Sequence, residues 1–132
     1  MNKLFSNSWK SSKQRRKQRK FRHNATLHIK HKFLSAHLSK DLMKKHSTRS
    51  LPVRKGDTVK IIRGQFRNHV GKVEKVLLKK TKIHVDGAEQ VKRDGTKSFY
   101  PIHPSNVIIT TLNLEDKMRQ KLLGRKNVKA SS

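Results

Sequence analysis

The stretch that most constrains the fold covers residues 54–73 and reads RKGDTVKIIRGQFRNHVGKV. Apolar and polar residues alternate over residues 59–63, a pattern typical of a half-buried strand rich in β-branched side chains. A compact basic loop over residues 64–69 follows, and residues 70–73 begin a second run of the same kind. The stretch therefore predicts a β-hairpin whose tip carries Arg63, Arg67, His69 and Lys72.

Three glycines and one asparagine of this stretch are predicted to serve backbone geometry. Glycine is placed where φ must be positive or where another group comes close. Asparagine visits the left-handed region more readily than other non-glycine residues. We expect Gly56, Gly64, Gly71 and Asn68 to shape the hairpin and to let backbone amides approach a partner.

Further short strands are predicted beyond the hairpin. Its second strand extends to residue 78, another covers residues 83–85, and a last one covers residues 107–110. Between them, Asp94-Gly95 is a two-residue hairpin signal flanked by residues 88–93 and 96–102. These short strands with tight turns indicate a small antiparallel barrel. Its predicted core consists of Val59, Ile61, Val73, Val76, Ile83, Val85, Ile102, Val107 and Ile109.

The N-terminal third is predicted to be a basic extension with short helices. Residues 1–22 form a tail with few apolar residues, which we expect to be disordered in the free protein. Apolar residues at loosely helical spacing follow over residues 24–36, with Asn24 as N-cap. Ser39 is placed to cap a short helix over residues 40–46, and residues 47–52 are interpreted as a linker.

The C-terminal part predicts one helix. Leu114, Met118 and Leu122 have i, i+4, i+8 spacing, Asn113 is placed as N-cap, and Gly124 as a stop. We expect the apolar stripe to pack on the barrel or on a neighbour. The predicted division of the chain is a tail (1–22), an extension (23–52), the barrel (53–111), a helix (112–124) and a basic tail (125–132).

The charge of the chain points to nucleic acid. There are 34 Lys and Arg residues against 8 acids, a net charge of +26, and only 32% of residues are hydrophobic. Such self-repulsion weakens a compact state unless a polyanion such as RNA neutralises it. An anionic membrane is the competing partner, but it requires an amphipathic helix with a large apolar face. No apolar run approaches the length of a membrane span.

The basic N-terminal region has alternative interpretations. Its first 40 residues lack acids, as organellar transit peptides do, but their cations are clustered and run directly into structured sequence. The run over residues 13–20 also fits a nuclear or nucleolar localisation signal. This region also contains the aromatic residues Phe5, Trp9 and Phe21. Aromatic side chains between cations can stack on unpaired bases.

Neither catalysis nor metal binding is predicted. There is no cysteine, which excludes disulfides, zinc ribbons and thiol nucleophiles. His28 and His31 have no carboxylate near them in sequence, and Lys30 and Lys32 would repel a cation. The acids are scattered at turns and at a helix start, without the pairing that acid–base chemistry needs. We therefore expect no enzyme activity, no cofactor and no metal, with His103 a structural or RNA-contacting imidazole.

Residues 54–73 resemble the KOW motif, a β–loop–β RNA-binding element, with Arg67-Asn68 where that family often has Lys-Gly. Three more stretches, LSKDL (38–42), RSLPVRKGD (49–57) and PIHPSNV (101–107), extend this resemblance. Together they are similar to the archaeal and eukaryotic form of the universal large-subunit ribosomal protein twenty-four family, over roughly residues 13–123.

The resemblance implies a mainly β fold, with an SH3-like (KOW) antiparallel barrel between the N-terminal extension and the C-terminal helix. It implies a structural constituent of the large ribosomal subunit that binds ribosomal RNA near the peptide tunnel exit and aids early assembly. Implied partners are neighbouring large-subunit proteins and nascent-chain targeting factors, with no membrane span and no obligate homo-oligomer. The location would be the cytoplasmic ribosome, or the nucleolus during assembly in a eukaryote.

The predicted RNA contacts combine the basic run, the hairpin and single residues of the specific stretches. They are Lys13, Arg15, Arg16, Lys17, Arg19, Lys20, Arg22, His28, Lys30, Lys32, Arg49, Arg54, Lys55, Arg63, Arg67, His69, Lys72 and His103.

Two alternative functions share these features. A KOW-type transcription-elongation module would share the hairpin, but it explains neither residues 13–53 nor the PIHPSNV run. A mitochondrial or plastid ribosomal protein is tested by whether the mature N-terminus begins upstream of Lys13.

Overall fold

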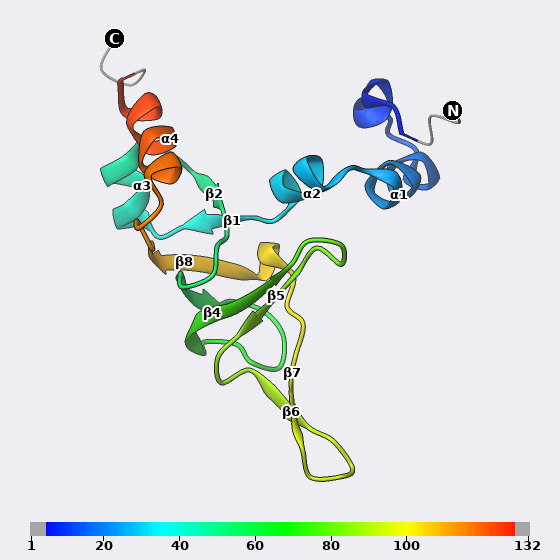
Figure 1. Cartoon of the computed structure of the whole chain (residues 1–132), viewed down its shortest axis with the longest axis vertical. Coiled ribbons are helices and arrows are strands. Elements are labelled where there is room, and N and C mark those ends of the chain that lie inside the picture. The colour runs from blue at the N-terminus through cyan, green and yellow to red at the C-terminus, as the bar shows by residue number, and fades with distance from the viewer. Residues whose placement is uncertain (1–4, 129–132) are drawn as a thin grey trace.

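The computed structural model describes residues 5–128, and Figure 1 shows a mainly β body flanked by helices. The strands are β1 (Ser35–Leu38), β2 (Ser50–Pro52), β3 (Thr58–Ile61), β4 (Val70–Leu77), β5 (Lys82–Val85), β6 (Glu89–Val91), β7 (Lys97–Phe99) and β8 (Val107–Thr111). The helices are η1 (Asn7–Ser11), α1 (Arg15–Asn24), α2 (Leu27–Phe33), α3 (Lys40–His46), η2 (Pro104–Asn106) and α4 (Lys117–Val128). The predicted fold class is confirmed.

Six strands form one sheet in the order β2-β1-β8-β3-β4-β5, with β6 and β7 as a separate pair. Neighbours are antiparallel, except that β1 runs parallel to β8. The sheet has two edges, β2 and β5, so the predicted barrel does not close, although the arrangement is compatible with an SH3-like fold. An isolated bridge between Ile83 and Ile102 ties β5 to the segment ahead of β8.

The predicted core is buried, with Val76 only half-buried at its edge. Sequence reasoning missed a second contribution to this core from the N-terminal extension. It consists of Leu34, Ala36, Leu38, Leu51 and Val53, all at most 1% exposed. Full burial of one aliphatic side chain contributes about 1.5–3 kcal/mol, so the extension is an integral part of the body.

The N-terminal extension differs locally from the prediction. α1 lies in the segment expected to be disordered, and it buries none of its residues. Disorder of this tail in the free protein stays a prediction, because no buried face fixes the helix to the body. The helical stretch predicted over residues 24–36 is interrupted, since α2 begins after Thr26 rather than after Asn24. The first four residues of the tail lie outside the described part.

Two strands follow α2: β1 begins within the predicted helical stretch over residues 24–36, and β2 lies in the expected linker over residues 47–52. Ala36 lies in β1 and pairs with Leu51 of β2. Pro52 requires extended geometry of Leu51, as predicted, and its ring ends β2 at the edge of the sheet. The short helix between these strands is confirmed as α3, and the Ser39 hydroxyl accepts the Leu42 amide at 3.4 Å as N-cap.

The C-terminal helix begins and ends later than predicted. α4 starts at Lys117, one Asp116 oxygen accepts the Met118 amide at 2.9 Å, and the helix continues through Gly124 to Val128. The predicted apolar stripe does not pack on the sheet, because Leu114, Met118 and Leu122 are 38%, 66% and 41% exposed. Its packing on a neighbour stays a prediction. The helix is instead attached through Arg119 and Leu123, which are buried. Of the predicted tail over residues 125–132, the last four lie outside the described part.

The Asp94-Gly95 hairpin is confirmed and projects away from the body as β6 and β7 (Figure 1). Pairing ends at Val91 and Lys97, and Gly95 has φ +80° within the turn. The Asp94 carboxylate accepts the amide and the hydroxyl of Thr96 at 3.0 and 2.7 Å, which lowers the Asp94 pKa. In the described residues, no helix has the length and apolar composition needed to span a membrane.

Candidate nucleic-acid interface

The loop between β3 and β4 is a compact scaffold for exposed cations. Two successive turns are each closed by a backbone hydrogen bond of 3.1 Å. The Arg67 amide donates to the Gly64 carbonyl, and the His69 amide donates to the Phe66 carbonyl. Gly64 has φ +94° and Asn68 has φ +69°, so both adopt the left-handed geometry predicted from the sequence. The side chains of Arg63 and Arg67 are exposed. They are therefore free to meet a polyanion.

The base of this loop is fixed by packing on the rest of the body. The Phe66 ring lies 5.6 Å from the Tyr100 ring, between centroids. His69 Nε2 donates to the Asp86 carbonyl at 2.8 Å, and its ring lies against Gly87. The side chain of His69, which was predicted to contact RNA, therefore fixes the position of the loop by its hydrogen bond to another segment of the protein. Lys72, on β4, remains exposed.

Gly71 and Gly56 are required by contacts within the chain. A Cβ on Gly71 would lie 2.4 Å from the Asp86 carbonyl oxygen, so β4 can approach the β5–β6 turn only with glycine there. Gly56 has φ +87°, and a Cβ on it would lie 2.8 Å from Nδ2 of the Asn113 side chain. Both glycines serve backbone geometry, but the group that approaches them belongs to the protein itself.

Aromatic side chains hold the N-terminal arm together. The Phe21 ring lies 5.1 Å from Phe5 and 6.0 Å from Phe33, which joins α1 to α2. Gln18 donates to the carbonyl oxygens of Lys10 and Ser12 at 3.0 and 2.7 Å, which folds η1 back on α1. Phe5 and Phe21 thus pack against other aromatic rings of the arm.

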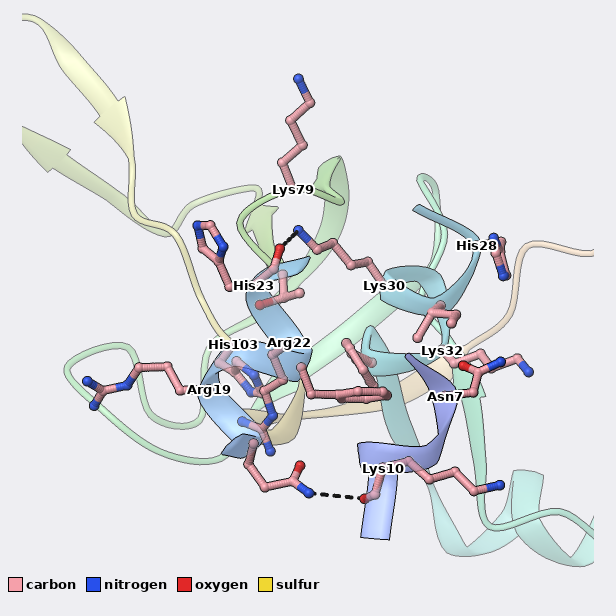
Figure 2. Close-up of a pocket in the computed structure, with 15 residues that line it drawn as sticks. Asn7, Lys10, Arg19, Arg22, His23, His28, Lys30, Lys32, Lys79 and His103 are labelled. Atoms are coloured by element: carbon pink, nitrogen blue, oxygen red, sulfur yellow. Dashed lines mark hydrogen bonds between the residues drawn. The ribbon is translucent and has the colours of Figure 1, made fainter. Parts of the chain in front are cut away.

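Helices α1 and α2 face the body across a cleft of about 810 Å³ (Figure 2). Its lining combines cations from both helices with Lys79 of the β4–β5 turn and His103 of the segment before β8. The predicted RNA contacts that line it are Arg19, Arg22, His28, Lys30, Lys32 and His103. Sequence reasoning missed Lys10 and Lys79, although the basic turn over residues 79–82 was visible.

The lining of the cleft contains no acid. Among the described residues, the ion pairs are Arg54–Asp116, Lys97–Glu89 and Arg119–Asp57, and none involves a residue of the cleft. The Lys30 ammonium donates to the His23 carbonyl at 3.1 Å. In the part of the chain that the structure describes, no other lysine or arginine side chain of the cleft donates to a backbone carbonyl. The cleft is therefore a concentrated site of positive charge.

His103 contributes a defined hydrogen-bond donor to this cleft. Its Nδ1 accepts the Ser105 amide at 3.2 Å and lies 2.8 Å from the Ser105 hydroxyl, as the cap of η2. Burial lowers the pKa of His103, and Lys82 and Arg22 lower it further. The imidazole is therefore neutral near pH 7, with its proton on Nε2.

The other predicted contacts are distributed over the surface. Lys13, Arg15, Arg16, Lys17 and Lys20 are exposed on α1 or just before it, and the Lys20 ammonium lies 5.2 Å from the centre of the Trp9 ring. Arg49 and Lys55 are exposed, outside the cleft and outside the β3–β4 loop. These cations form separate sites rather than one cluster.

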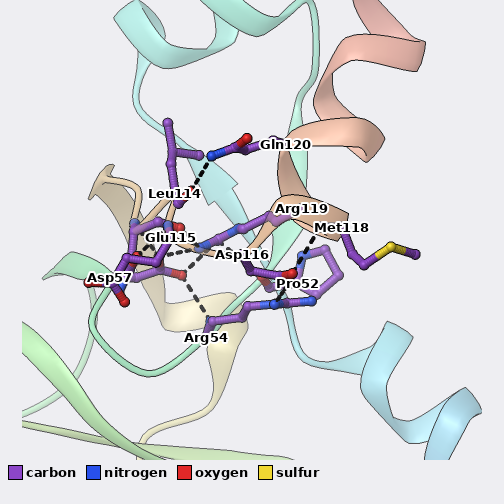
Figure 3. A network of polar contacts seen from close by, with 10 residues as sticks. Pro52, Arg54, Asp57, Leu114, Glu115, Asp116, Met118, Arg119 and Gln120 are labelled. Atoms are coloured by element: carbon purple, nitrogen blue, oxygen red, sulfur yellow. Dashed lines mark hydrogen bonds and ion pairs between the residues drawn. The ribbon is translucent and has the colours of Figure 1, made fainter.

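Arg54 belongs to a polar network that attaches α4 to the body (Figure 3). It pairs with Asp116, just ahead of the helix. Beside it, Arg119 reaches both oxygens of Asp57 at 2.5 and 2.8 Å, and Asp57 also accepts the amides of Arg54 and Asn113, each at 2.9 Å. Asp57 was assigned only to a turn, because periodicity cannot reveal a partner 62 residues away.

The family model for eukaryotic ribosomal protein L26 and its archaeal counterpart matches residues 12–126. The large ribosomal subunit protein uL24 of Methanosphaera stadtmanae is 52% identical over 115 residues, which cover 87% of this chain and 98% of that protein. The protein of the same name from Pyrobaculum islandicum is 48% identical over 116 residues, covering 88% and 94%. The matched region includes the basic arm as well as the sheet.

Proposed function

The chain belongs to the family of eukaryotic L26 and the corresponding archaeal ribosomal proteins, and from this premise we propose that its cationic surfaces bind large-subunit ribosomal RNA. Membership makes it a structural constituent of the large ribosomal subunit and not an enzyme. Its location is the ribosome, and its partners there are ribosomal RNA and other ribosomal proteins. The transcription-module alternative is disfavoured, since the family match extends over the arm from residue 12.

The observation that supports RNA contact is the separation of charge in the described residues. Exposed cations occupy the β3–β4 loop, α1 and the cleft, whereas Asp57 and Asp116 pair with arginines and Asp94 binds its own turn. Each cation that meets a phosphate releases a condensed counterion, which drives association. Arg63 and Arg67 can also form bidentate contacts with phosphate or stack on a base, while Lys72 supplies a point charge.

The proposed mechanism is the fixing of RNA segments by a rigid body and an adaptable arm. The β3–β4 loop is preorganised by its turns and by Phe66 and His69. The arm has no buried residue in α1 and would order fully only against RNA, at an entropic cost that its many phosphate contacts offset. The protein would thereby hold RNA helices in one arrangement.

We also propose a position near the peptide tunnel exit and a role in early subunit assembly, both implied by the family resemblance. Nascent-chain targeting factors would then be neighbours, and assembly in a eukaryote would begin in the nucleolus. Crosslinking in translating ribosomes tests the position, since nascent chains should be captured. Depletion of the protein tests the assembly role, since large-subunit precursors should accumulate.

The first experiment is sedimentation of a cell extract at physiological and then at high salt. The protein is expected to travel with large subunits and whole ribosomes, and to remain there when loosely bound factors are removed. Crosslinking from the positions of Arg63 and Arg67 should then capture ribosomal RNA. A protein that stays near the top of the gradient, or follows RNA polymerase, contradicts the proposal.

A further inference from the structure

We propose that the cleft between the N-terminal arm and the body binds one unpaired nucleotide of RNA, with its phosphate among the cations and its base against the arm. This inference rests on the proposed RNA-binding function and specifies the form of RNA that one site accepts. The volume of about 810 Å³ lies within the roughly 300–1,000 Å³ of pockets that enclose small ligands.

The charge of the cleft requires an anion. Lys10, Arg19, Arg22, Lys30, Lys32 and Lys79 line it, and no acid in the described residues pairs with them. Like charges gathered around a partly enclosed space repel one another more strongly than charges in open water. A phosphate in the cleft removes this repulsion, and the guanidinium groups of Arg19 and Arg22 can offer it bidentate donors.

The cleft also has an apolar side, which a phosphate alone would not use. Phe21, Ile29 and Phe33 line it beside the cations. The Phe21 and Phe33 rings lie edge to face, 6.0 Å apart between centroids, so two aromatic rings are next to each other on this side. Proteins recognise unpaired RNA by placing splayed bases on aromatic rings or arginine planes and their phosphates on cations. A nucleotide combines both chemistries, whereas inorganic phosphate matches only one.

The body adds a donor that does not depend on charge. Nδ1 of His103 is used by Ser105, and Nε2 has no partner among the described residues. As the imidazole lines the cleft, its Nε2–H can donate to a phosphate or sugar oxygen. Figure 2 shows His103 beside Arg22, so donors from the arm and the body converge on one place.

The shape of the site favours a single strand over a duplex. The cations line a concave space, whereas the phosphates of a duplex lie on a convex surface and could reach only its rim. The exposed cations of α1, such as Arg15 and Arg16, are the surface available to a duplex. The cleft therefore has a different RNA preference from the rest of the arm.

The test compares two double variants of the full chain that each remove two positive charges. Arg22→Gln with Lys79→Gln changes the cleft, and Lys44→Gln with Lys45→Gln changes two exposed residues of α3, outside the cleft. Affinity for single-stranded and duplex RNA is measured against salt concentration, and circular dichroism confirms folding. Each lost phosphate contact lowers the salt slope for single strands by about 0.7.

The slope for single-stranded RNA is expected to fall by about 0.7 in the cleft variant, because the one phosphate in the cleft loses its contact, and to stay unchanged in the α3 variant. Binding of duplex should be nearly the same in both. Equal losses in the two variants, or a loss confined to duplex, would overturn the inference.

A second measurement separates this inference from the proposed function. A photoreactive residue at Thr81, an uncharged lining position, is introduced into the protein within large subunits. Crosslinking to an unpaired nucleotide supports the inference. If the protein sediments with large subunits but Thr81 crosslinks only to paired RNA or to protein, the cleft assignment fails while the proposed function stands.

Discussion

The buried ion pair between Asp57 and Arg119 leads to a strong prediction about stability. Their side chains are 0% and 3% exposed, and they connect α4 to the start of β3. Asp57→Asn keeps the size of the side chain but leaves the guanidinium buried without its counter-charge. Removal of one partner from a buried pair costs about 3–5 kcal/mol. This is a large part of the roughly 5–15 kcal/mol that stabilises a typical domain.

The matched control is Arg54→Gln, which breaks the neighbouring pair with Asp116. Its side chains are 40% and 33% exposed, so the expected loss is about 0–1 kcal/mol. Urea unfolding is followed by circular dichroism, in salt sufficient to screen the net charge of +26. If Asp57→Asn costs no more than Arg54→Gln, the pair does not secure α4 and the reasoning is refuted.

A double variant determines whether the loss comes from the isolated charge. Asp57→Asn combined with Arg119→Met removes both charges and leaves an apolar side chain in the space of the guanidinium. Since replacement of a whole buried pair is often neutral, the double variant should be more stable than Asp57→Asn alone. A loss equal to the sum of the two single losses would instead mean that the residues act independently.

Three further predictions concern backbone geometry and pH. Gly71→Ala should lower the free energy of unfolding by several kcal/mol, measured in urea, because its Cβ would lie 2.4 Å from the Asp86 carbonyl oxygen. Asn68→Gly should be tolerated, whereas Asn68→Val should be destabilising in the same assay, because φ is +69°. Burial lowers the pKa values of His46 and His84 below 6.5, helped by neighbouring lysines. The unfolded chain therefore binds more protons than the folded chain as pH falls through 6.5. The free energy of unfolding should decrease as pH drops from 7 through 6.5 towards the folded pKa values. Replacement of both histidines by Gln should make the free energy of unfolding less dependent on pH in this range.

Local signals in the sequence were sufficient to predict much of the sheet. Alternation predicted β3 and β4, and Asp94-Gly95 predicted the β6–β7 hairpin, because each depends on neighbours in sequence. Asn68 and Ser39 were correct for the same reason, since a left-handed residue and an N-cap are determined within a few positions. These interactions are short-ranged, so their residue patterns are visible in one sequence.

The missed features depend on distant partners. β1 is short, and its strand character comes from the pairing of His37 and Leu38 with β8, some 70 residues later. The face of α4 that packs on the body was not predicted, because the apolar spacing suggested only Leu114, Met118 and Leu122 as a packing face. In the structure Arg119 lies on the inner face of α4, because its guanidinium donates to the buried Asp57 carboxylate. A periodicity argument treats an arginine as exposed unless its partner is known.

The cleft was missed as a unit because its residues come from separate segments. Arg22 and Lys30 were predicted individually as RNA contacts, but Lys79 was not among the predicted contacts. Their convergence depends on the position of α1 and α2 beside the body, which residue types alone cannot reveal. The prediction of charge was therefore better than the prediction of shape.

The distribution of the acids links the fold to the proposed function. Asp57 and Asp116 pair with arginines at α4, Glu89 lies 3.9 Å from Lys97, and Asp94 binds its own turn. Acids used in this way do not neutralise the cations of the loop and the cleft. Of the cations in these pairs, Arg119 is buried, so nearly all of the remaining positive charge is available to RNA. Because the Asp57–Arg119 pair and Leu123 attach α4 to the body, the exposed Leu114, Met118 and Leu122 are left free to contact a neighbour.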